Sequence, residues 1–450
     1  MKDSNFLAEH NARHMWHPMA HPAESIANPP KVIVKAEGVH ITDMHGHRTL
    51  DAVGGLWNVN LGFSCEPVKR AIAEQLAELP YYSAFRGTSN DKAIELSVEL
   101  ARFFAPDGMS RAFYTSGGSD SVETALRLAR QYHKVRGDHG RTKFLSLKKG
   151  YHGTHFGGAS VNGNANFRTA YEPLLGGCFQ MPAPYTYRNP FGESDPARLA
   201  QLCIAAIEDE IAFQGAGTIA AFIMEPVLGA GGVIPPHESF MPMVREVCTR
   251  NGILLISDEV ITGFGRTGSW SGARHWGVKP DMMCTAKAIT TGYFPFGAVM
   301  IADAVAEVFE KDDGPMGAIG HGYTYSAHPV GAAAALACLA ETERLAVHEN
   351  AAARGAELFE GLKGLAERHD VIGDVRGGHG LMLALELVSD RAAKTPLDKV
   401  SVARIHEATY QAGVMVRISG HNVLLSPSLI LSAEEAAGIV EALDAGLKAA

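Results

Sequence analysis

The sequence predicts an α/β protein in which a parallel sheet is covered by helices on both faces. Short, almost continuously apolar runs recur between about residues 90 and 310, as expected of strands buried on both sides. Stretches with the spacing of amphipathic helices separate these runs. The chain has 450 residues, more than one core usually holds, so a second folding unit is expected beside the sheet.

The N-terminal part predicts an arm followed by a small sheet. Residues 1–30 contain four prolines and are expected to be irregular. Residues 32–38 and 40–51 predict short strands with turns at glycine, and residues 66–79 have the apolar spacing of a helix.

The central part supplies the sheet and the helices that cover it. Its apolar runs span residues 111–116, 143–147, 219–226, 252–260, 281–287 and 297–302. Residues 121–135 have the spacing of a helix that packs on such a sheet. Ligands of parallel sheets bind at the carboxyl ends of the strands, so polar motifs at those ends are candidate site residues.

The C-terminal part changes character and predicts a smaller α+β unit. Residues 329–347 and 354–368 predict helices, whereas residues 380–388 and 414–418 predict strands. The expected parts are an N-terminal arm with part of a small domain (1–60), a large cofactor-binding domain (61–330) and a C-terminal small domain (331–450).

Charge and cysteine usage disfavour several functional classes. The formal net charge of −9 argues against nucleic acid or an anionic membrane as the main partner. No apolar run reaches the ~18 residues of a membrane span, and we expect no signal peptide. The six cysteines form no C-x-x-C pair, which indicates a reducing, cytoplasmic location and argues against a zinc ribbon or a disulfide framework.

Two residues at successive strand ends are the strongest candidates for chemistry. Asp258 ends one buried run, in ISDEVITGFGRTG, and Lys287 ends the next, 29 residues later. At the carboxyl edge of a sheet, an acid can pair with the pyridine nitrogen of pyridoxal phosphate. A lysine partly removed from water can act there as a nucleophile and then as a base. Taken alone, Asp258 could be a helix cap and Lys287 an ordinary surface lysine, so the prediction depends on the two residues together.

Two further motifs follow strand ends. TSGGSDSVETALRLAR places Gly118 and Ser119 in a glycine-rich turn before a helix, where backbone N–H groups can bind a phosphate. The alternative is a helix start that Ser119 or Asp120 caps. KKGYHGTHFG offers Tyr151 for stacking on the pyridine ring, with His152 nearby, although such a pair also fits a structural turn.

Two other patterns are weaker. GFGRTG (263–268) matches a dinucleotide fingerprint but leads into no helical pattern, and residues 286–290 hold no acid, so a nicotinamide dehydrogenase is disfavoured. The four histidines within residues 10–21 have near-helical spacing, but prolines interrupt them and no carboxylate or thiol joins them. We therefore expect exposed or interface histidines and no metal site.

Taken together, the motifs resemble those of class III aminotransferases, which use pyridoxal 5'-phosphate, in their ω-amino acid:pyruvate (ω-transaminase) branch. The resemblance runs from about Trp16 to the C-terminus and is carried by FYTSGGSDSVETAL, GYHG, EPVLGAGGV, LLISDEVITGFGRTG, TAKAITTGYFPFGAV and HGYTYSAHPVGAAAAL. It implies fold type I, with a mainly parallel seven-stranded sheet in a large domain and a smaller α+β domain built from both chain ends. It also implies a homodimer, or a dimer of dimers, with shared active sites.

Matched residue by residue, the resemblance assigns roles to the strand-end residues. It makes Lys287 the lysine that holds the cofactor as a Schiff base and Asp258 the partner of the pyridine nitrogen. Tyr151 matches the ring-stacking aromatic residue, with His152 beside it. Val260 matches the aliphatic residue on the opposite face of the ring.

The phosphate site is also implied by the resemblance. Gly118 and Ser119 match the phosphate loop. This chain has SGGS at 116–119 where the family usually has Asn-Ser-Gly-Ser, so one hydroxyl is missing and backbone contacts must contribute more. Tyr323 and Thr324 match the pair that reaches the phosphate of the other subunit's cofactor.

The substrate pocket is inferred in the same way. Positions that line it in the family correspond to Trp57, Phe85, Tyr151 and Ala230. Met19 falls where relatives often carry an aromatic residue.

Two arginines and one acid complete the candidate pocket. Arg417 matches the arginine that binds the substrate carboxylate; the alternative is a strand-edge arginine in a surface ion pair. Arg86 is less expected, and either offers a second anion contact for a longer or acidic donor or is solvated. Glu225 lies near the site in the family, without an assigned role.

The predicted activity is a ping-pong transfer of an amino group from an ω-amino acid or amine to pyruvate or a similar keto acid. An aminomutase, a racemase or a decarboxylating aminotransferase would share the same core motifs and is the alternative. A non-catalytic relative is disfavoured because Lys287 and Asp258 are both present. The sequence does not specify the donor or the preferred enantiomer.

Overall fold

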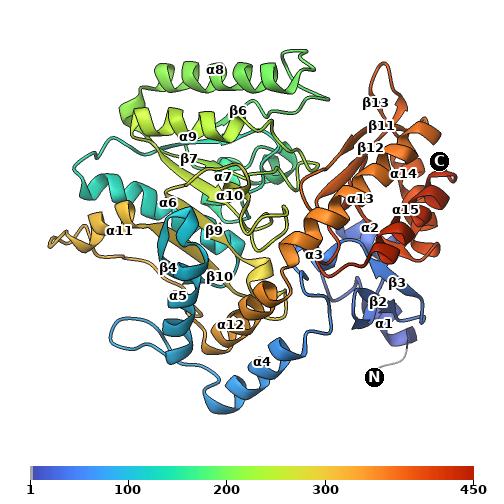
Figure 1. The fold of residues 1–450 in the computed structure, drawn as a ribbon, viewed down its shortest axis with the longest axis horizontal. Coiled ribbons are helices and arrows are strands. Elements are labelled where there is room, and N and C mark those ends of the chain that lie inside the picture. The colour runs from blue at the N-terminus through green and yellow to red at the C-terminus, as the bar shows by residue number, and fades with distance from the viewer. Residues whose placement is uncertain (1–3) are drawn as a thin grey trace.

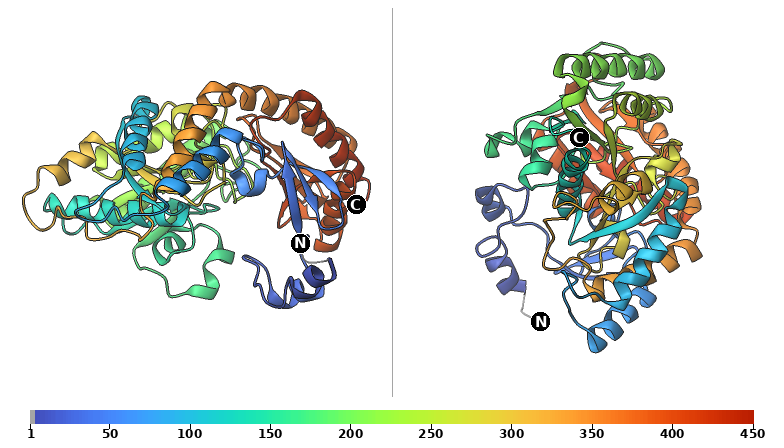
Figure 2. Two further views of the ribbon diagram at one scale, coloured as in Figure 1. Left: turned by 90° about the horizontal axis from the view of Figure 1, so that it is seen from below. Right: turned by 90° about the vertical axis from the view of Figure 1, so that its left-hand side faces the viewer.

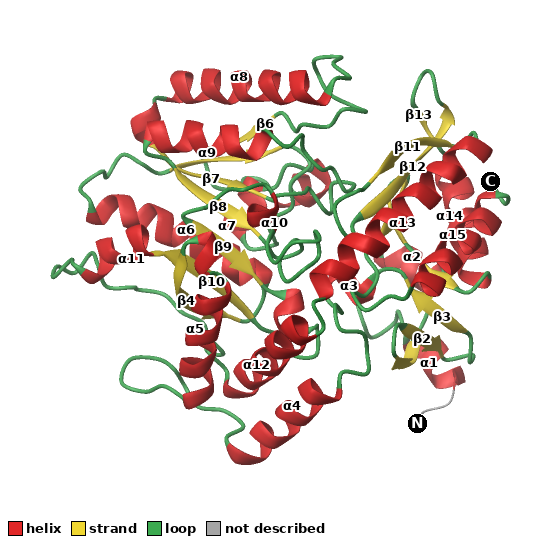
Figure 3. Ribbon diagram, in the orientation of Figure 1, coloured by secondary structure: helices red, strands yellow, loops and turns green. Residues whose placement is uncertain are grey.

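The computed structural model describes residues 4–450, which form three sheets with helices around them (Figures 1 and 3). The strands of the largest sheet are β4 (Met109–Thr115), β5 (Lys143–Leu147), β6 (Cys178–Met181), β7 (Ile219–Met224), β8 (Leu254–Asp258), β9 (Met282–Thr285) and β10 (Gly297–Ala302). Their order is β4-β10-β9-β8-β7-β5-β6. Only β10 runs antiparallel to its neighbours, so the prediction of a mainly parallel seven-stranded sheet is confirmed.

Helices cover both faces of this sheet. α8 (Pro196–Gln214) and α9 (Phe240–Asn251) contribute to the core on one face, and α6 (Gly118–Val135) contributes to the core on the other. Alternate residues of β7 point into the two cores: Phe222 into the first and Ile223 into the second. β7, β8 and β9 are therefore buried along their whole length, as their apolar runs predict.

The other helices lie around the sheet edges and in the terminal parts of the chain. They are α1 (Ser4–His10), α2 (Pro22–Ala27), α3 (Gly54–Trp57), α4 (Glu66–Glu78), α5 (Asp91–Phe103), α7 (Phe156–Val161), α10 (Gly272–His275), α11 (Asp303–Glu310), α12 (Pro329–Arg344), α13 (Val347–Arg368), α14 (Lys399–Gln411) and α15 (Ala433–Leu447). The prediction of an irregular arm was wrong for α1 and α2, because Pro22 starts a helix that the His21 side chain caps. None of the described helices is long and apolar enough to cross a membrane.

Two smaller sheets contain the remaining strands. One joins β1 (Ile33–Glu37), β2 (His40–Asp43) and β3 (Arg48–Asp51) to β14 (Val414–Met415). The other contains β11 (Ile372–Arg376), β12 (Leu383–Asp390), β13 (Thr395–Pro396), β15 (Arg417–Ser419) and β16 (Asn422–Leu425). The predicted single strand at 414–418 was wrong, since its first half pairs in parallel with β3 and its second half pairs antiparallel with β16.

Residues from both chain ends share a hydrophobic core. Leu50 and Val68 belong to it together with Leu362, Leu425 and Leu443. Figure 2 shows the N-terminal strands beside the C-terminal helices. This shared core agrees with a small unit built from both ends, while the domain boundaries near residues 60 and 330 stay predictions.

The GFGRTG segment forms turns and opens no helix, so it does not have the geometry of a dinucleotide fingerprint. Its arginine, Arg266, is fully buried and donates to the carbonyls of Leu381 and Pro427 and to the side chain of Asn60. Burial lowers the pKa of Arg266 to about 9, against the opposing effect of the Asp51 charge. Through Arg266, the segment therefore connects the large sheet with the N-terminal part of the chain at Asn60 and with the C-terminal part at Leu381 and Pro427.

Candidate active site

A cavity of about 400 Å³ lies at the carboxyl edge of the large sheet. The chain runs from the ends of β4, β5, β7, β8 and β9 into its wall, because parallel strands end at a common edge. It is lined by all the residues that we expected to be catalytic or to bind the cofactor within one chain: Gly118, Ser119, Tyr151, His152, Asp258, Val260 and Lys287.

Lys287 is a lysine without a partner. It follows β9 in a left-handed backbone conformation, with φ +49°, and begins a short 3-10 turn. Within the described chain its amine makes no hydrogen bond or ion pair. Burial lowers the pKa of Lys287 to about 8, although the charges of Asp258 and Glu225 oppose this shift. A substantial fraction of the amine is therefore neutral near physiological pH and able to act as a nucleophile or a base.

Asp258 and His152 form a buried pair. The Asp258 carboxylate lies 2.8 Å from His152 Nδ1, and the Val260 N–H donates to its other oxygen at 3.2 Å. The carboxylate is 3% exposed. With a carboxylate as acceptor, Nδ1 carries the proton, which leaves Nε2 of His152 buried and without a partner in the described chain. The pair holds a fixed negative charge at the cavity floor.

Glu225 connects two segments of the cavity wall. It follows β7, and its two carboxylate oxygens accept the N–H groups of Tyr151 (2.9 Å) and Gly229 (2.8 Å). Burial raises the pKa of Glu225 to about 7; His152 lowers it and Asp258 raises it further. Its position directly after a strand was the signal that could have assigned it to the wall.

The start of α6 forms another part of the wall. Gly117 is the N-cap residue and no side chain caps the helix, so neither Ser119 nor Asp120 has the capping role considered above. An uncapped helix N-terminus favours an anion, because its first N–H groups are free to donate. A Cβ atom at Gly118 would lie 2.8 Å from Val260 Cγ1, so this position accepts only glycine without a shift.

Comparison with known proteins identifies the family to which this arrangement belongs. The model of the class-III aminotransferase family matches residues 22–447. The chain belongs to this family. The aminotransferase is similar in structure to an amine transaminase from an uncultivated Pseudomonas species, solved in its pyridoxal-phosphate-bound form. The TM-score is 0.95 and the identity 49%, over 97% of this chain and 98% of that one.

Two sequence relatives of the aminotransferase differ in the acceptor that their names give. The diaminobutyrate–2-oxoglutarate transaminase of Halomonas elongata is 38% identical and covers 92% of this chain, with 89% of its own length matched. The putrescine–pyruvate aminotransferase of Pseudomonas aeruginosa is 35% identical and covers 89% of this chain, with 87% of its own length matched. The aminotransferase therefore has fold type I and uses pyridoxal phosphate.

The residues of the cavity fit this cofactor. The amine of half-buried Lys287 has no partner within the described chain, and Nε2 of His152 is a buried polar atom without one, so both are free to meet a ligand. The uncapped start of α6 suits a phosphate, and Asp258 suits a protonated ring nitrogen. No group of three or more histidine, cysteine, aspartate or glutamate residues in the described chain could hold a metal ion.

Some predicted pocket residues of the aminotransferase lie beside the cavity. Arg417 lines an adjoining cavity that shares Leu56 with it, and Met19 lines another that shares Gly153. The guanidinium of Arg417 makes no ion pair or hydrogen bond within residues 4–450, so it does not have the surface-pair role considered above. Burial lowers the pKa of Arg417, and Tyr151 opposes this shift. Arg417 is thus available to a ligand.

Trp57 does not reach the cavity. It is 2% exposed and packs in the hydrophobic core, whereas Leu56 is 51% exposed and lines the cavity with Asn58. Positive φ angles at Gly54, Gly55 and Trp57 turn the chain so that the tryptophan points inward. Sequence reasoning missed Leu56 and Asn58 because nothing in their spacing shows this turn. Ala230 is half-buried in the loop after Glu225 and is not part of the cavity wall.

Four further predicted residues lie on another surface of the chain: Phe85 and Arg86, expected in the substrate pocket, and Tyr323 and Thr324, expected to reach the other subunit's cofactor. Phe85 and Arg86 line a separate cavity with His321, and it shares no residue with the cavity at the sheet edge. The Tyr323 hydroxyl donates to the Asp120 carbonyl of α6 at 3.0 Å. The Thr324 carbonyl accepts from the Tyr81 hydroxyl at 2.7 Å. Within one chain, none of the four lines the candidate active site.

Proposed function

We propose that the aminotransferase moves an amino group from an ω-amino acid or another amine to pyruvate in two alternating half-reactions. The observation that carries the proposal is the unpartnered Lys287, which shares one cavity with Asp258 and has the unpaired Arg417 in the adjoining cavity. A nucleophilic amine, a fixed carboxylate and a free guanidinium are the groups that this transfer needs from the protein.

Lys287 is the residue that moves protons. Bound pyridoxal phosphate supplies an electron sink, which lets a hydrogen leave the amine-bearing carbon of the donor as a proton. Lys287 would take this proton on Nζ, and in the second half-reaction it would deliver one to the equivalent carbon of the acceptor. A pKa of about 8 lets the same amine do both near neutral pH.

The other residues of the cavity wall would hold and orient the cofactor. Asp258, fixed by His152, would keep the ring nitrogen protonated, and Tyr151 and Val260 would hold the ring from opposite sides. Gly118 and Ser119, with the start of α6, would hold the phosphate.

The number of arginines near the site within one chain supports pyruvate as the acceptor. No arginine lines the cavity at the sheet edge, and Arg417 is the single arginine of the adjoining cavity. A single guanidinium matches a keto acid with one carboxylate, such as pyruvate. The putrescine–pyruvate relative agrees with this choice, whereas a 2-oxoglutarate acceptor would call for a second guanidinium, and within one chain neither cavity has one.

A homodimer or a dimer of dimers would complete the site. Phe85, Arg86, Tyr323 and Thr324 lie on a surface that a second subunit could use, and we propose that they reach the partner's cavity. Arg86 would then offer the second anion contact to a longer or acidic donor. The six cysteines are free, which suits a cytoplasmic enzyme.

The test is a half-reaction titration. The cofactor-loaded protein is mixed in turn with β-alanine, taurine, putrescine, 1-phenylethylamine and alanine while the visible absorption of the cofactor is followed. We expect at least one donor to bleach the band and pyruvate to restore it more efficiently than 2-oxoglutarate. A band that no donor bleaches would favour a mutase or a racemase. If no band forms with added pyridoxal phosphate, the role of Lys287 is wrong.

A further inference from the structure

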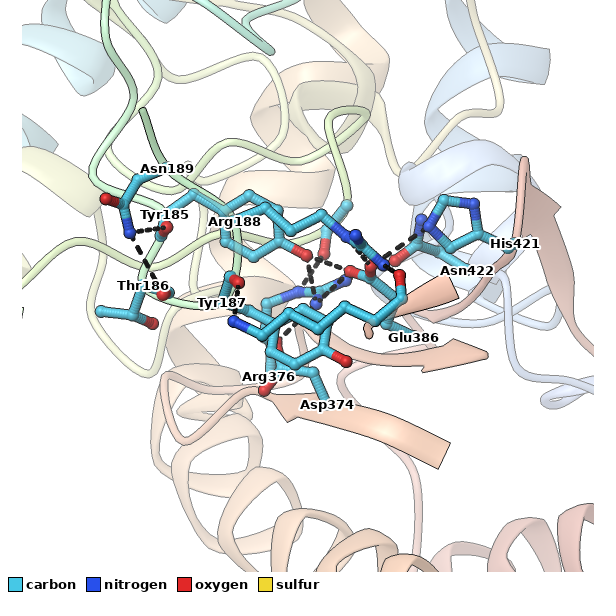
Figure 4. Close-up of polar contacts among 12 residues, drawn as sticks. Tyr185, Thr186, Tyr187, Arg188, Asn189, Asp374, Arg376, Glu386, His421 and Asn422 are labelled. Carbon is cyan, nitrogen blue, oxygen red and sulfur yellow. Dashed lines mark hydrogen bonds and ion pairs between the residues drawn. The ribbon is translucent and has the colours of Figure 1, made fainter. Parts of the chain in front are cut away.

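A second buried group of polar side chains lies outside the active site (Figure 4). We call it the Arg376–Glu386 network; its members are Tyr185, Arg188, Arg376, Glu386, His421 and Asn422. The Glu386 carboxylate is 1% exposed and accepts from Arg376 (2.9 Å), Arg188 (2.5 Å), His421 (3.2 Å) and the Tyr185 hydroxyl. Arg376 is 7% exposed, so both charges of the central pair are removed from water.

Burying such a pair is a weak source of stability. The desolvation of two charges offsets most of their attraction, and apolar residues of similar size often serve a core as well. We therefore infer that this buried ion pair serves to fix the positions of the segments it joins more than to add stability. The segments that Arg376 joins indicate which positions these are.

On one side, Arg376 holds the hairpin that carries Arg417. Arg376 Nη2 donates to Asn422 Oδ1, and the Asn422 amide donates to the Ser419 carbonyl at 3.2 Å. His421, at the tip of the same hairpin, contacts Glu386. Arg417 is the first residue of β15, which ends two residues later at Ser419 and pairs with β16. The contacts of Ser419, His421 and Asn422 therefore hold the hairpin close to Arg417.

On the other side, Arg376 holds the loop behind the active-site cavity. Arg376 Nε donates to the Gly232 carbonyl at 2.8 Å. The same loop presents the Gly229 N–H to Glu225, whose second oxygen accepts the N–H of Tyr151. One guanidinium thus connects the hairpin of Arg417 with the loop that braces Tyr151.

We propose that Arg376 and Glu386 are positioning residues for the substrate carboxylate. They hold the hairpin that carries Arg417 at a fixed place relative to Tyr151, so that its guanidinium can reach the carboxylate while the reacting carbon lies at Lys287. This inference depends on the proposed role of Arg417. Asp374 also pairs with Arg376, at 2.7 Å, but within the described chain its side chain makes no hydrogen bond or ion pair with the hairpin or the loop. It therefore provides a matched control.

The experiment compares Arg376→Lys and Asn422→Ala with Asp374→Asn in the cofactor-loaded, full-length enzyme. We measure the Kd of propionate, an unreactive carboxylate, and the ratio of kcat/KM for β-alanine to that for 1-phenylethylamine, which has no carboxylate. We expect the first two variants to raise the Kd and lower the ratio by about tenfold each. We expect the control to change either by less than about twofold. Thermal melting confirms that each variant is folded, and half-buried Asn422 provides the test if Arg376→Lys is not.

Arg417→Ala separates the two ways in which the experiment can fail. If Arg417→Ala raises the propionate Kd but the folded network variants leave both values unchanged, the network is only structural and the inference is wrong. If Arg417→Ala also changes neither value, the proposed role of Arg417 itself is wrong. A purely structural role would lower the melting temperature without moving the ratio between the two donors.

Discussion

At the carboxyl edge of the large sheet, two side-chain nitrogen atoms are left without partners, whereas the charged groups of the Arg376–Glu386 network are densely paired. Lys287 has no partner in the described chain, and Nε2 of His152 has none. Glu386, by contrast, accepts from four side chains. An unsatisfied buried group costs free energy that a ligand can recover, while a satisfied one fixes geometry. The same residue types thus mark a binding site in one place and a scaffold in the other.

The largest effect is expected where an unpartnered group does the chemistry. Lys287→Ala should lower kcat/KM for amine and pyruvate by about ten-thousand-fold, because no other amine lines the cavity. Steady-state kinetics of the folded, cofactor-loaded variant measure this. Lys279→Ala removes an exposed lysine close to the same strand and should change little. Retention of a hundredth of the activity by Lys287→Ala would show that another group moves the proton.

Removing Glu386 from the Arg376–Glu386 network should mainly lower the free energy of unfolding. Glu386→Leu removes the buried carboxylate that pairs with buried Arg376 and half-buried Arg188, leaving Arg376 only Asp374 as a carboxylate partner, and should destabilise the enzyme by about 3–5 kcal/mol. Urea unfolding measures the change. The matched change in an exposed pair, Glu360→Leu opposite Lys363, should stay within about 1 kcal/mol. Equal losses at the two sites would mean that Glu386 contributes no more than a surface ion pair.

The smallest effect concerns the pH dependence that Glu225, in the cavity wall at the sheet edge, gives to stability. Burial raises the pKa of Glu225 from 4.5 to about 7, so between these values the folded, cofactor-free chain binds more protons than the unfolded chain. The contribution of Glu225 to stability is therefore fully present below pH 4.5 and is lost as the pH rises through about 7. Glu225→Gln should remove on the order of 1–3 kcal/mol of this fall, measured by urea unfolding across pH. Exposed Glu37→Gln should leave the slope unchanged, and an unchanged slope in Glu225→Gln would contradict the assignment.

The sequence predicted most of the large sheet and its candidate site, because both depend on a simple rule. Buried parallel strands are almost continuously apolar, and their polar ends meet at one edge. The run 143–147 coincides with β5 and the run 297–302 with β10. For the same reason Asp258 and Lys287, 29 residues apart in the sequence, line one cavity.

Other features depend on backbone geometry that the residue pattern does not contain. The positive φ angles before Trp57 decide that it points into the core and that Leu56 faces the cavity. Residues 414–418 form two strands because their first half pairs with β3 in one sheet and their second half with β16 in another. The Arg376–Glu386 network joins segments about two hundred residues apart, as in the contact from Tyr185 to Glu386, so no local pattern indicates it.

Arg266 also constrains the order in which the nascent chain can fold. Its buried guanidinium needs the carbonyls of Leu381 and Pro427, which the ribosome adds more than one hundred residues later. Until those residues have emerged, closing the core around Arg266 would leave a charge without its acceptors. The turn between β8 and β9 therefore reaches its final form only when almost the whole chain has been synthesised. A truncated product without these residues would leave Arg266 without its carbonyl acceptors, so we expect it to be prone to proteolysis and to aggregation.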